Sequence, residues 1–426
     1  MRAPTTRRRG VLNEGTALRD RSCAAEDAFL ASRSRTHPCL HELAFLKRRV
    51  RLLHVAGVVN SGDFVDSLLR GLDTSIFDIH MLVGEPPRRR GCSPSVSYGT
   101  TTAGYPFSRR HIPRLAKSIH TAIQSFSPDI LHAHHFDENV AAALVTVIDH
   151  VPVYVIGRHY SDHVYTLTTG VKRRALLAVE AFCNWRATTI IVPTEEVRRL
   201  LVERQRVPAS KVTCIPYALD LEGFRPSAAT AVESLRAALT PDSGPLVVAC
   251  CRLNHEKGLD LLLRAQAVVT QRHPRLRVAL VGEGPARESL ERLAAELGTR
   301  GRVIFAGWQT NVADWLAAAD VVVQPSYSES YCQVLIEALS LGRAFAMTPV
   351  GAAPEVIGRD ERGVLIPRGD AAALAVALER LVSEPELRAR LGSAGRQYVE
   401  TRLQPAQSIR RHEQLYLSTL RQTDRP

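Results

Sequence analysis

From about residue 50 onward, short runs of apolar, β-branched residues alternate with longer stretches whose apolar positions recur at helical spacing. In the first half of the chain, such stretches predict helices over residues 109–126 and 172–185. The apolar runs of this half predict strands over residues 51–58, 77–83, 129–133, 152–156, 188–192 and 212–215.

The same alternation restarts after residues 222–226 and an alanine-rich helix. Helical spacing predicts helices over residues 259–272, 286–297 and 371–382, followed by a long charged helical tail over 384–420. Apolar runs predict strands over residues 246–251, 277–281, 303–305, 321–324, 344–347 and 364–366.

Strands and helices that alternate at these lengths are typical of parallel sheets covered by helices on both faces. Two such series predict an α/β protein of two Rossmann-like domains that face each other across a cleft, with ligands at the carboxyl ends of the strands. We expect the C-terminal helix to cross back to the N-terminal domain. The expected parts are a basic leader over residues 1–48, an N-terminal domain over 49–225, a C-terminal domain over 226–400, and a C-terminal helix and tail over 401–426.

The charge of the chain leaves two kinds of partner to consider. The formal net charge is +12, but basic residues are not interleaved with aromatic ones, so nucleic acid is not expected as a partner. Basic runs at 88–90 and 172–174 fit peripheral contact with an anionic membrane surface, and they also fit an ordinary solvated surface. No apolar run reaches the roughly 18 residues that would predict a membrane span, and residues 140–148 are better interpreted as a buried helix.

The first 50 residues carry 11 Lys and Arg against 5 Asp and Glu. Residues 5–9 resemble the start of a twin-arginine export signal, but polar residues occupy the place of the apolar segment that such a signal requires. This leader is expected to be a disordered arm, or translated sequence upstream of the true start. The eight cysteines show no metal-ligand spacing, so reduced thiols and a cytoplasmic location are expected, with membrane association on the cytoplasmic face left open.

Two acidic residues flank a predicted helix start in the second half. Glu329 lies in the loop after the strand that ends at residue 324, and Glu337 lies on the helix that follows. This spacing suits one carboxylate that binds a sugar and one that accepts hydrogen bonds from ribose hydroxyls, while the free amides of the helix start face a phosphate. Two ordinary glutamates around a helix start would show the same pattern.

Two cations follow the first strand of the second series. Arg252 and Lys257 leave the carboxyl end of this strand, where a phosphate would lie, and both could neutralise a diphosphate. Only five of the 55 basic residues are lysines, which makes a lysine here informative. The alternative is a salt bridge at the helix start with Glu256 or Asp260.

Histidines cluster at the end of a predicted strand of the first half. His132, His134 and His135 could bind zinc, but no carboxylate or cysteine partner stands at suitable spacing. The chain also has no Asp-x-Asp pair of the kind that holds a divalent ion on a diphosphate. We therefore expect neither a metal nor any other required cofactor.

The motifs of the second half, in their order and spacing, resemble glycosyltransferase family 4, whose members are retaining enzymes with the GT-B fold. The resemblance covers roughly residues 50 to 420. It rests on an Arg-x4-Lys-Gly loop, a Gly-Glu-Gly turn, a Glu-x7-Glu element and a Gly-rich helix start, at residues 252–258, 282–284, 329–337 and 351–357.

The resemblance implies roles for particular residues. It implies that Arg252 and Lys257 hold the donor diphosphate, Glu337 the ribose and Glu329 the transferred sugar. The turn Gly282, Glu283 and Gly284 would approach the nucleotide. In the first half, Gly62 would allow close approach of the backbone to the donor phosphates, and His159 would lie near the transferred sugar. A hydrogen-bonded structural imidazole is the alternative for His159.

Three positions depart from the family pattern. Tyr217 and Ala218 replace the usual Asn-Gly, and Ser330, Tyr331 and Cys332 replace a common Gly-Phe-Gly that would contact the donor. Ala352 replaces the second glycine of a common Gly-Gly. The bulkier residues would narrow the sugar pocket, so the sequence leaves the identity of the nucleotide and sugar open.

The expected function is retaining transfer of a sugar from a nucleoside diphosphate sugar to an acceptor hydroxyl, in the synthesis of a glycan, glycolipid or polysaccharide. A sugar-nucleotide epimerase or a sugar phosphorylase of the same fold is one alternative. The other is a catalytically silent subunit that only binds the sugar nucleotide. The sequence leaves the class of the hydroxyl acceptor open.

Overall fold

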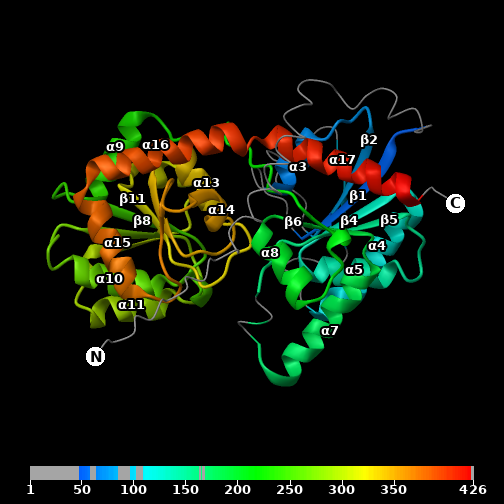
Figure 1. Ribbon diagram of the computed structural model, residues 1–426, viewed down its shortest axis with the longest axis horizontal. Helices are drawn as coiled ribbons and strands as arrows, with labels where there is room; N and C mark the ends of the chain where they lie inside the picture. The colour runs from blue at the N-terminus through cyan, green and yellow to red at the C-terminus, as the bar shows by residue number, and fades with distance from the viewer. Residues whose placement is uncertain are drawn as a thin grey trace, which may run out of the picture. The chain divides into compact units, whose positions relative to one another are not determined.

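The computed structural model describes residues 48–57, 64–84, 96–101, 109–162, 165 and 168–423, and those from Val50 onward belong to one compact unit. Within this part of the chain, the first half forms a parallel sheet of strand order β3-β2-β1-β4-β5-β6-β7 (Figure 1). Its strands are β1 (Val50–Ala56), β2 (Phe77–Val83), β3 (Val96–Thr100), β4 (Ile130–His134), β5 (Val153–Gly157), β6 (Thr189–Val192) and β7 (Val212–Cys214).

The helices of this half alternate with its strands, as the spacing of apolar residues predicts. They are α3 (Phe64–Gly71), α4 (Ile112–Phe126), α5 (Phe136–Val145), α7 (Gly170–Arg186) and α8 (Glu195–Arg199). The apolar core lies between the sheet and α4, α5 and α7. The prediction of a buried helix over 140–148 is wrong at its end, because α5 stops at Val145 and Ile148 is 84% exposed.

The second half forms another parallel sheet, of strand order β10-β9-β8-β11-β12-β13. Its strands are β8 (Leu246–Cys250), β9 (Arg277–Val281), β10 (Val303–Gly307), β11 (Val321–Gln324), β12 (Ala344–Met347) and β13 (Val364–Leu365). Its helices are α9 (Ala229–Leu239), α10 (Leu259–Val269), α11 (Arg287–Glu296), α12 (Val312–Ala318), α13 (Gln333–Ser340), α14 (Ala353–Ile357) and α15 (Ala371–Ser383). The prediction of two α/β domains with parallel sheets is confirmed.

Strand order reverses at one place in each sheet. The reversal lies between β1 and β4 in the first sheet and between β8 and β11 in the second. Helices that follow the two central strands leave toward opposite sides at such a point, which opens a crevice at the carboxyl ends of the strands. The strand order of each sheet therefore predicts one ligand-binding crevice, at the carboxyl ends of its two central strands.

The predicted helical tail consists of two helices, α16 (Pro385–Arg402) and α17 (Pro405–Thr423), and not one. Pro405 lacks the N–H that would continue α16, and its ring suits the first turn of a new helix. Helix α16 packs against α13 and β12, whereas α17 packs against α3 and β5 of the first half (Figure 1). Among the described residues, no helix is both long and apolar enough to cross a bilayer.

Candidate active site

A cavity of about 780 Å³ opens at the carboxyl ends of the central strands. Residues that follow β8 and β11 line one side, and the starts of α3 and α5 line the other. Polar loops begin where the buried apolar residues of these strands end. Of the predicted site residues, His159, Arg252, Lys257, Glu329, Ser330, Tyr331 and Cys332 line this cavity.

Lys257 and Glu329 form an ion pair inside the cavity. The Lys257 Nζ lies 2.8 Å from Glu329 Oε1, and the two side chains are 17% and 11% exposed. The Ser326 hydroxyl donates to the same carboxylate oxygen at 2.8 Å. Burial alone would lower the pKa of Lys257, but Glu329 outweighs burial and raises it, so the lysine stays charged. The partner is thus Glu329, and not the Glu256 or Asp260 that sequence spacing also allowed.

Gly258 fixes the position of the lysine loop. It adopts φ 63° directly after the short 3₁₀ turn His255–Lys257, and a Cβ on it would lie 2.1 Å from the carbonyl oxygen of Pro325. Only glycine allows this backbone to pack against the chain that follows β11. The loop is therefore held where Lys257 reaches Glu329, 72 residues later in the sequence.

Arg252 is exposed at the rim of the same cavity. Within the described part of the chain, no carboxylate lies within ion-pair distance of its guanidinium. The cavity therefore contains one cation that is already neutralised and one that is available to an anionic ligand.

The turn before α13 is closely packed. Cys332 adopts φ 71° and ψ 78°, which is left-handed backbone, and Tyr331 is 3% exposed. The Ser330 hydroxyl donates to the carbonyl oxygen of His159 at 2.9 Å and so joins the two halves of the chain. Burial raises the pKa of the Cys332 thiol well above its ordinary value, so the thiol remains protonated.

Both ring nitrogens of His159 have partners within the protein. Its Nε2 lies 2.9 Å from His134 Nδ1, and its Nδ1 lies 2.9 Å from the Tyr217 hydroxyl. Burial lowers the pKa of His159 well below its ordinary value, so the ring is neutral. A neutral imidazole with both nitrogens occupied has none left for a ligand, and the Tyr217 hydroxyl lines the cavity beside it.

Four predicted site residues do not line this cavity: Gly282, Glu283, Gly284 and Glu337. A Cβ on Gly282 or Gly284 would lie 2.1 Å or 2.3 Å from a carbonyl oxygen of the chain that follows β8, so both glycines serve close backbone packing. Glu283 pairs with Arg287 at 2.7 Å. Gly62 lies outside the described residues.

Glu337 lies on α13 beside the end of β8, and burial raises the pKa of its carboxyl to about 7. The sequence pattern placed it correctly on the helix, but the pattern does not reveal that the carboxyl is buried. Of the seven strands of the first sheet, β3 was also missed, because the run Val96–Thr100 has only one buried residue.

Sequence reasoning missed Phe64 and the aromatic stack that it forms in the cavity. Phe64 stacks on Tyr217 with ring centroids 4.3 Å apart, and Tyr217 lies 4.5 Å from Tyr331 of the second half. His135 also lines the cavity, with φ 63° and ψ −179°, a backbone region that is almost restricted to glycine. The departure of Tyr217 from the family pattern was the available signal, although sequence alone gave no neighbour for it.

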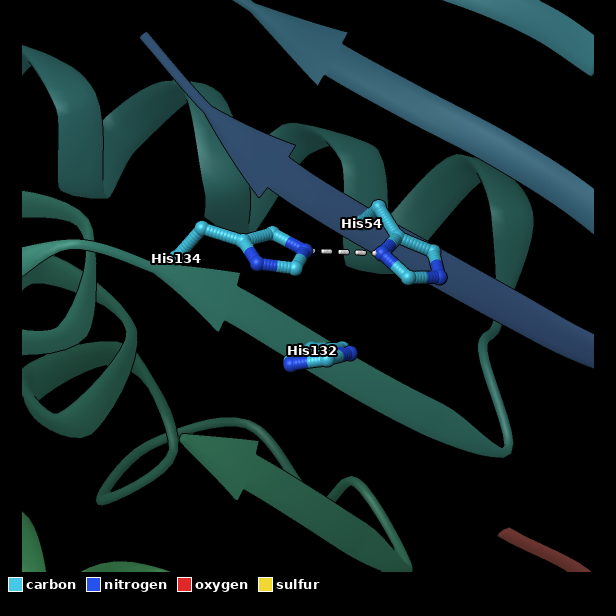
Figure 2. Close-up of side chains that lie close together, drawn as sticks. All are labelled: His54, His132 and His134. Atoms are coloured by element: carbon cyan, nitrogen blue, oxygen red, sulfur yellow. Dashed lines mark hydrogen bonds between the residues drawn. The ribbon is translucent and has the colours of Figure 1, made fainter. Parts of the chain in front are cut away.

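Three buried histidines could share a metal ion. Ring nitrogens of His54, His132 and His134 lie within 4.8 Å of one another, and none of these side chains is exposed (Figure 2). However, His54 Nδ1 and His134 Nε2 point at each other across 2.9 Å, and His132 Nδ1 lies 2.8 Å from the Tyr416 hydroxyl. These directions fit hydrogen bonds better than ligation of one ion, which requires lone pairs that converge on a common point.

Family models match both halves of the chain. The model described as glycosyl transferases group 1 matches residues 232–398, and the model described as glycosyltransferase family 4 matches residues 62–222. The D-inositol 3-phosphate glycosyltransferase of Streptomyces avermitilis is 34% identical over 225 residues, which are 50% of this chain and 48% of that protein. The alpha-D-kanosaminyltransferase of Streptomyces kanamyceticus is 28% identical over 61% of this chain and 70% of its own length. The chain thus spans about half the length of the first of these relatives.

Solved structures share the arrangement of the two sheets. Sucrose-phosphate synthase from Thermosynechococcus elongatus has a TM-score of 0.74 at 22% identity, over 87% of this chain and 99% of its own. Anabaena HepE, solved in complex with UDP and glucose, has a TM-score of 0.70 at 17% identity, over 87% of this chain and 100% of its own. At these identities the likeness establishes the fold. With a family match on each half and this shared fold, the chain belongs to the family 4-like glycosyltransferases of the GT-B fold.

Proposed function

We propose that the protein transfers a glycosyl group from a nucleoside diphosphate sugar to an acceptor hydroxyl, with retention of the anomeric configuration. One observation carries the proposal: Arg252, Lys257 and Glu329 converge on a single cavity at the carboxyl ends of the strands. Cations next to a sugar-binding carboxylate suit a ligand that joins a diphosphate to a sugar. Relatives and structural neighbours that are named for glycosyl transfer or were solved with UDP also support a nucleotide-sugar donor.

Donor binding separates the ion pair between Lys257 and Glu329. The diphosphate takes Lys257 and Arg252, and Glu329 then accepts hydrogen bonds from hydroxyls of the transferred sugar. Gln333, the first residue of α13, also lines the cavity, and the amides of a first helical turn have no partners within their helix. These amides supply further donors for phosphate oxygens.

The ribose and the nucleotide are assigned to residues next to the cavity. Glu337 accepts hydrogen bonds from the ribose hydroxyls, and the turn Gly282–Gly284 approaches the nucleotide. Gly62 is assigned to the donor phosphates by resemblance alone. These roles stay predictions, as do the domain boundaries after residues 48, 225 and 400.

The reaction needs no covalent nucleophile on the protein. Negative charge grows on the leaving diphosphate, where Arg252, Lys257 and the amides of α13 stabilise it. A phosphate oxygen of the leaving group takes the proton of the acceptor hydroxyl on the same face of the sugar. The two cations supply the charge that a metal ion supplies in other transferases, so we propose no cofactor.

Replacement of Arg252 tests the donor site with little risk to the fold, since its side chain is exposed. A panel of UDP-, GDP- and ADP-glucose should include at least one donor that raises the melting temperature of the protein. Arg252→Ala should weaken that donor by about tenfold or more, because a charge-assisted contact to the diphosphate is lost. Arg390→Ala on α16, also an exposed arginine, is the matched control and should bind normally.

Labelled donor separates the remaining alternatives. Net transfer to an acceptor supports the proposal, whereas isomerised donor indicates an epimerase and phosphate-dependent cleavage indicates a phosphorylase. A donor that binds but never turns over indicates a silent binding subunit. The proposal would be rejected if none of the three sugar nucleotides raised the melting temperature and Arg252→Ala behaved like the unsubstituted protein in the same assay.

Contact with an anionic membrane surface also stays a proposal. Lys172 and Arg174 are exposed near the start of α7, and Val171 beside them is 81% exposed. Basic and apolar side chains together suit the interface of a bilayer on the cytoplasmic side. The expected result is sedimentation with phosphatidylglycerol vesicles but not with phosphatidylcholine vesicles. Sedimentation with neither kind of vesicle would refute the proposed membrane contact.

A further inference from the structure

A chain of three hydrogen bonds connects the core of the first half with the cavity. His54 Nδ1 lies 2.9 Å from His134 Nε2, and His134 Nδ1 lies 2.9 Å from His159 Nε2. His159 Nδ1 lies 2.9 Å from the Tyr217 hydroxyl. Neighbouring rings are nearly parallel, at 11° for His54 and His134 and at 18° for His134 and His159, as in a chain of aligned donors and acceptors.

All three imidazoles are neutral, because burial lowers the pKa of His54 to about 3 and those of His134 and His159 well below the ordinary value. A neutral imidazole carries one N–H and one lone pair. His134 and His159 use both nitrogens within the chain, so every hydrogen bond must run in the same direction. Either all of them donate toward the cavity or all of them donate away from it.

The last hydrogen bond, at the cavity end, can run either way. The Tyr217 hydroxyl has one hydrogen and lone pairs, so it can donate to His159 Nδ1 or accept from it. The direction is therefore set at the far end of the chain of hydrogen bonds.

An unpartnered atom at that far end selects the direction. His54 Nε2 is buried and has no partner among the described residues. Donation toward the cavity leaves a lone pair at this atom, whereas the opposite direction would leave an unpaired N–H. Unpaired buried donors are the rarer of the two in proteins, which favours donation toward the cavity.

We propose that His134, backed by His54, is a positioning residue that holds His159 as its Nδ1–H tautomer and so makes the Tyr217 hydroxyl a hydrogen-bond donor to the transferred sugar. When a donor binds, the Tyr217 hydroxyl directs its hydrogen to a sugar oxygen. Tyr217 also lies near Glu329, the carboxylate assigned to that sugar, so both groups can contact the transferred sugar.

This polarity favours one kind of substrate group. A hydroxyl or carboxylate oxygen can accept from Tyr217, whereas a protonated amine at the same position can only donate to the Tyr217 oxygen. A sugar oxygen is therefore the group that uses the Tyr217 hydrogen. The assignment of the ligand rests on the proposed function, but the direction of the histidine chain does not.

Nitrogen-15 NMR of the histidine rings tests the direction in the full chain without any ligand. His54, His134 and His159 should each be protonated at Nδ1 and unprotonated at Nε2. His412 is an internal reference, because its Nδ1 bonds the Ser408 carbonyl at 2.8 Å and must carry the hydrogen. An Nε2–H signal from any of the three, or a stoichiometric metal ion in the purified protein, would overturn the proposal.

Two substitutions at His134 distinguish positioning from packing. His134→Gln retains an N–H that can donate to His159, and His159 should remain protonated at Nδ1. His134→Leu removes this donor, and an Nε2–H population of His159 should appear. An unchanged His159 tautomer in His134→Leu would show that His134 does not fix it.

Tyr217→Phe tests the contact with the sugar and keeps the ring that stacks on Phe64. The probes are UDP-, GDP- and ADP-glucose, each compared with its bare nucleoside diphosphate. The best-binding sugar nucleotide should weaken about tenfold in the variant, while its bare diphosphate should bind unchanged. An equal loss for both, or no loss for either, contradicts the assignment to the sugar. Failure of every sugar nucleotide to bind the unsubstituted protein rejects the proposed function and leaves the NMR result standing.

Discussion

At the scale of single residues, the backbone of Cys332 is held in a conformation that favours glycine. At φ 71° it costs an L-residue roughly 1–2 kcal/mol, and a β-branched side chain costs more. Cys332→Val should therefore lower the free energy of unfolding by about 2 kcal/mol, whereas Cys332→Gly should be tolerated. Urea denaturation of both variants measures the difference. Equal stability of the two variants would contradict the strain.

The carboxyl of Glu337 gives a prediction for pH. Its pKa of about 7 lies above the 4.5 of an exposed glutamate, so the empty protein loses stability as the pH rises from 4.5 toward 7. The ionised form is the better acceptor for ribose hydroxyls, so donor affinity should increase with pH up to about 7. Titration of the donor at several pH values should show this slope, and Glu337→Gln should remove it. A wild-type slope that survives in Glu337→Gln would assign it to another group.

Much of the residue-level site could be predicted, because Arg252, Lys257 and Glu329 all lie directly after strands, where parallel sheets place ligands. The pairing of Lys257 with Glu329 could not be predicted, since it depends on how β8 and β11 lie side by side. Tyr217 was recognised only as a departure from a pattern. Its stacking on Phe64 depends on packing between distant segments, which local sequence does not encode.

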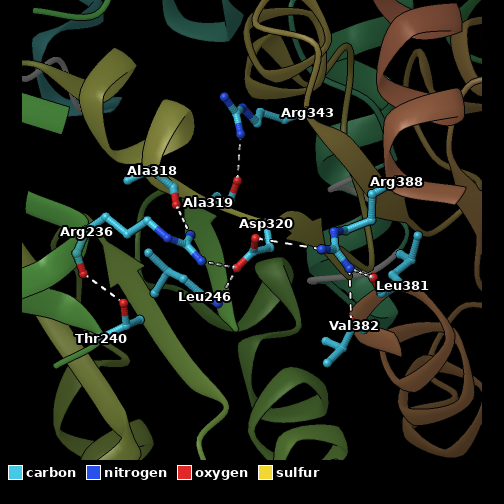
Figure 3. A network of polar contacts seen from close by, with 10 residues as sticks. All are labelled: Arg236, Thr240, Leu246, Ala318, Ala319, Asp320, Arg343, Leu381, Val382 and Arg388. Atoms are coloured by element: carbon cyan, nitrogen blue, oxygen red, sulfur yellow. Dashed lines mark hydrogen bonds and ion pairs between the residues drawn. The ribbon is translucent and has the colours of Figure 1, made fainter. Parts of the chain in front are cut away.

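At the scale of elements, a polar network ties helices to the amino ends of β8 and β11 (Figure 3). Asp320 accepts from Arg236 Nη2 and from the Leu246 amide, each at 2.8 Å, and Arg388 of α16 lies 4.0 Å away. Arg236 also donates to the Ala318 carbonyl at 2.6 Å. One carboxylate thus joins a strand and two helices on the side of the sheet opposite the cavity.

Loss of this carboxylate should destabilise the second domain without a direct effect on the donor site. Asp320→Ala leaves a partly buried arginine and a strand amide without their acceptor, which costs about 2 kcal/mol. Thermal unfolding with and without a bound donor measures both effects. Asp314→Ala is the control, because among the described residues Asp314 accepts from the Ser227 amide and from Asn311, which lie outside this network. A large loss of donor affinity in Asp320→Ala would contradict the separation of the two sides.

Element boundaries could be predicted within a few residues wherever the apolar pattern was strong, as at β9, β11 and β12. The pattern failed where tertiary burial is weak. Strand β3 is mostly half-exposed at the sheet edge, and the break at Pro405 occurs within a continuous amphipathic pattern. In both cases the decisive information is a neighbour or a missing N–H, and not the periodicity of apolar residues.

At the scale of the whole molecule, a set of contacts joins the two halves beside the cavity. Glu355 Oε1 accepts from the Glu195 amide at 2.8 Å, and Glu196 Oε2 accepts from the Gly351 amide at 2.5 Å. The Thr194 hydroxyl donates to the Ser330 carbonyl at 3.2 Å. The Ser330 carbonyl and the Gly351 amide belong to the loops after β11 and β12, so these contacts link closure of the halves to the position of those loops.

Removal of one such contact should admit water to the reaction. Glu355→Ala should increase hydrolysis of the donor relative to transfer by roughly threefold, because closure excludes water from the reacting sugar. The ratio of free sugar to transferred sugar measures it. Glu361→Ala removes an exposed carboxylate that, in the part of the chain that the structure describes, pairs with its neighbour Arg362, and it should leave the ratio unchanged. An unaltered ratio in Glu355→Ala would mean that the contact does not control closure.

The ion pair between Lys257 and Glu329 bears on the end of the catalytic cycle as well as on its start. A spent nucleoside diphosphate retains phosphates for the lysine but no longer brings sugar hydroxyls for the glutamate. The unpaired Glu329 carboxylate then attracts the Lys257 ammonium group again, and the re-formed ion pair weakens the binding of the nucleotide. On the proposed function, the re-formed ion pair thus helps to release the product before the next turnover.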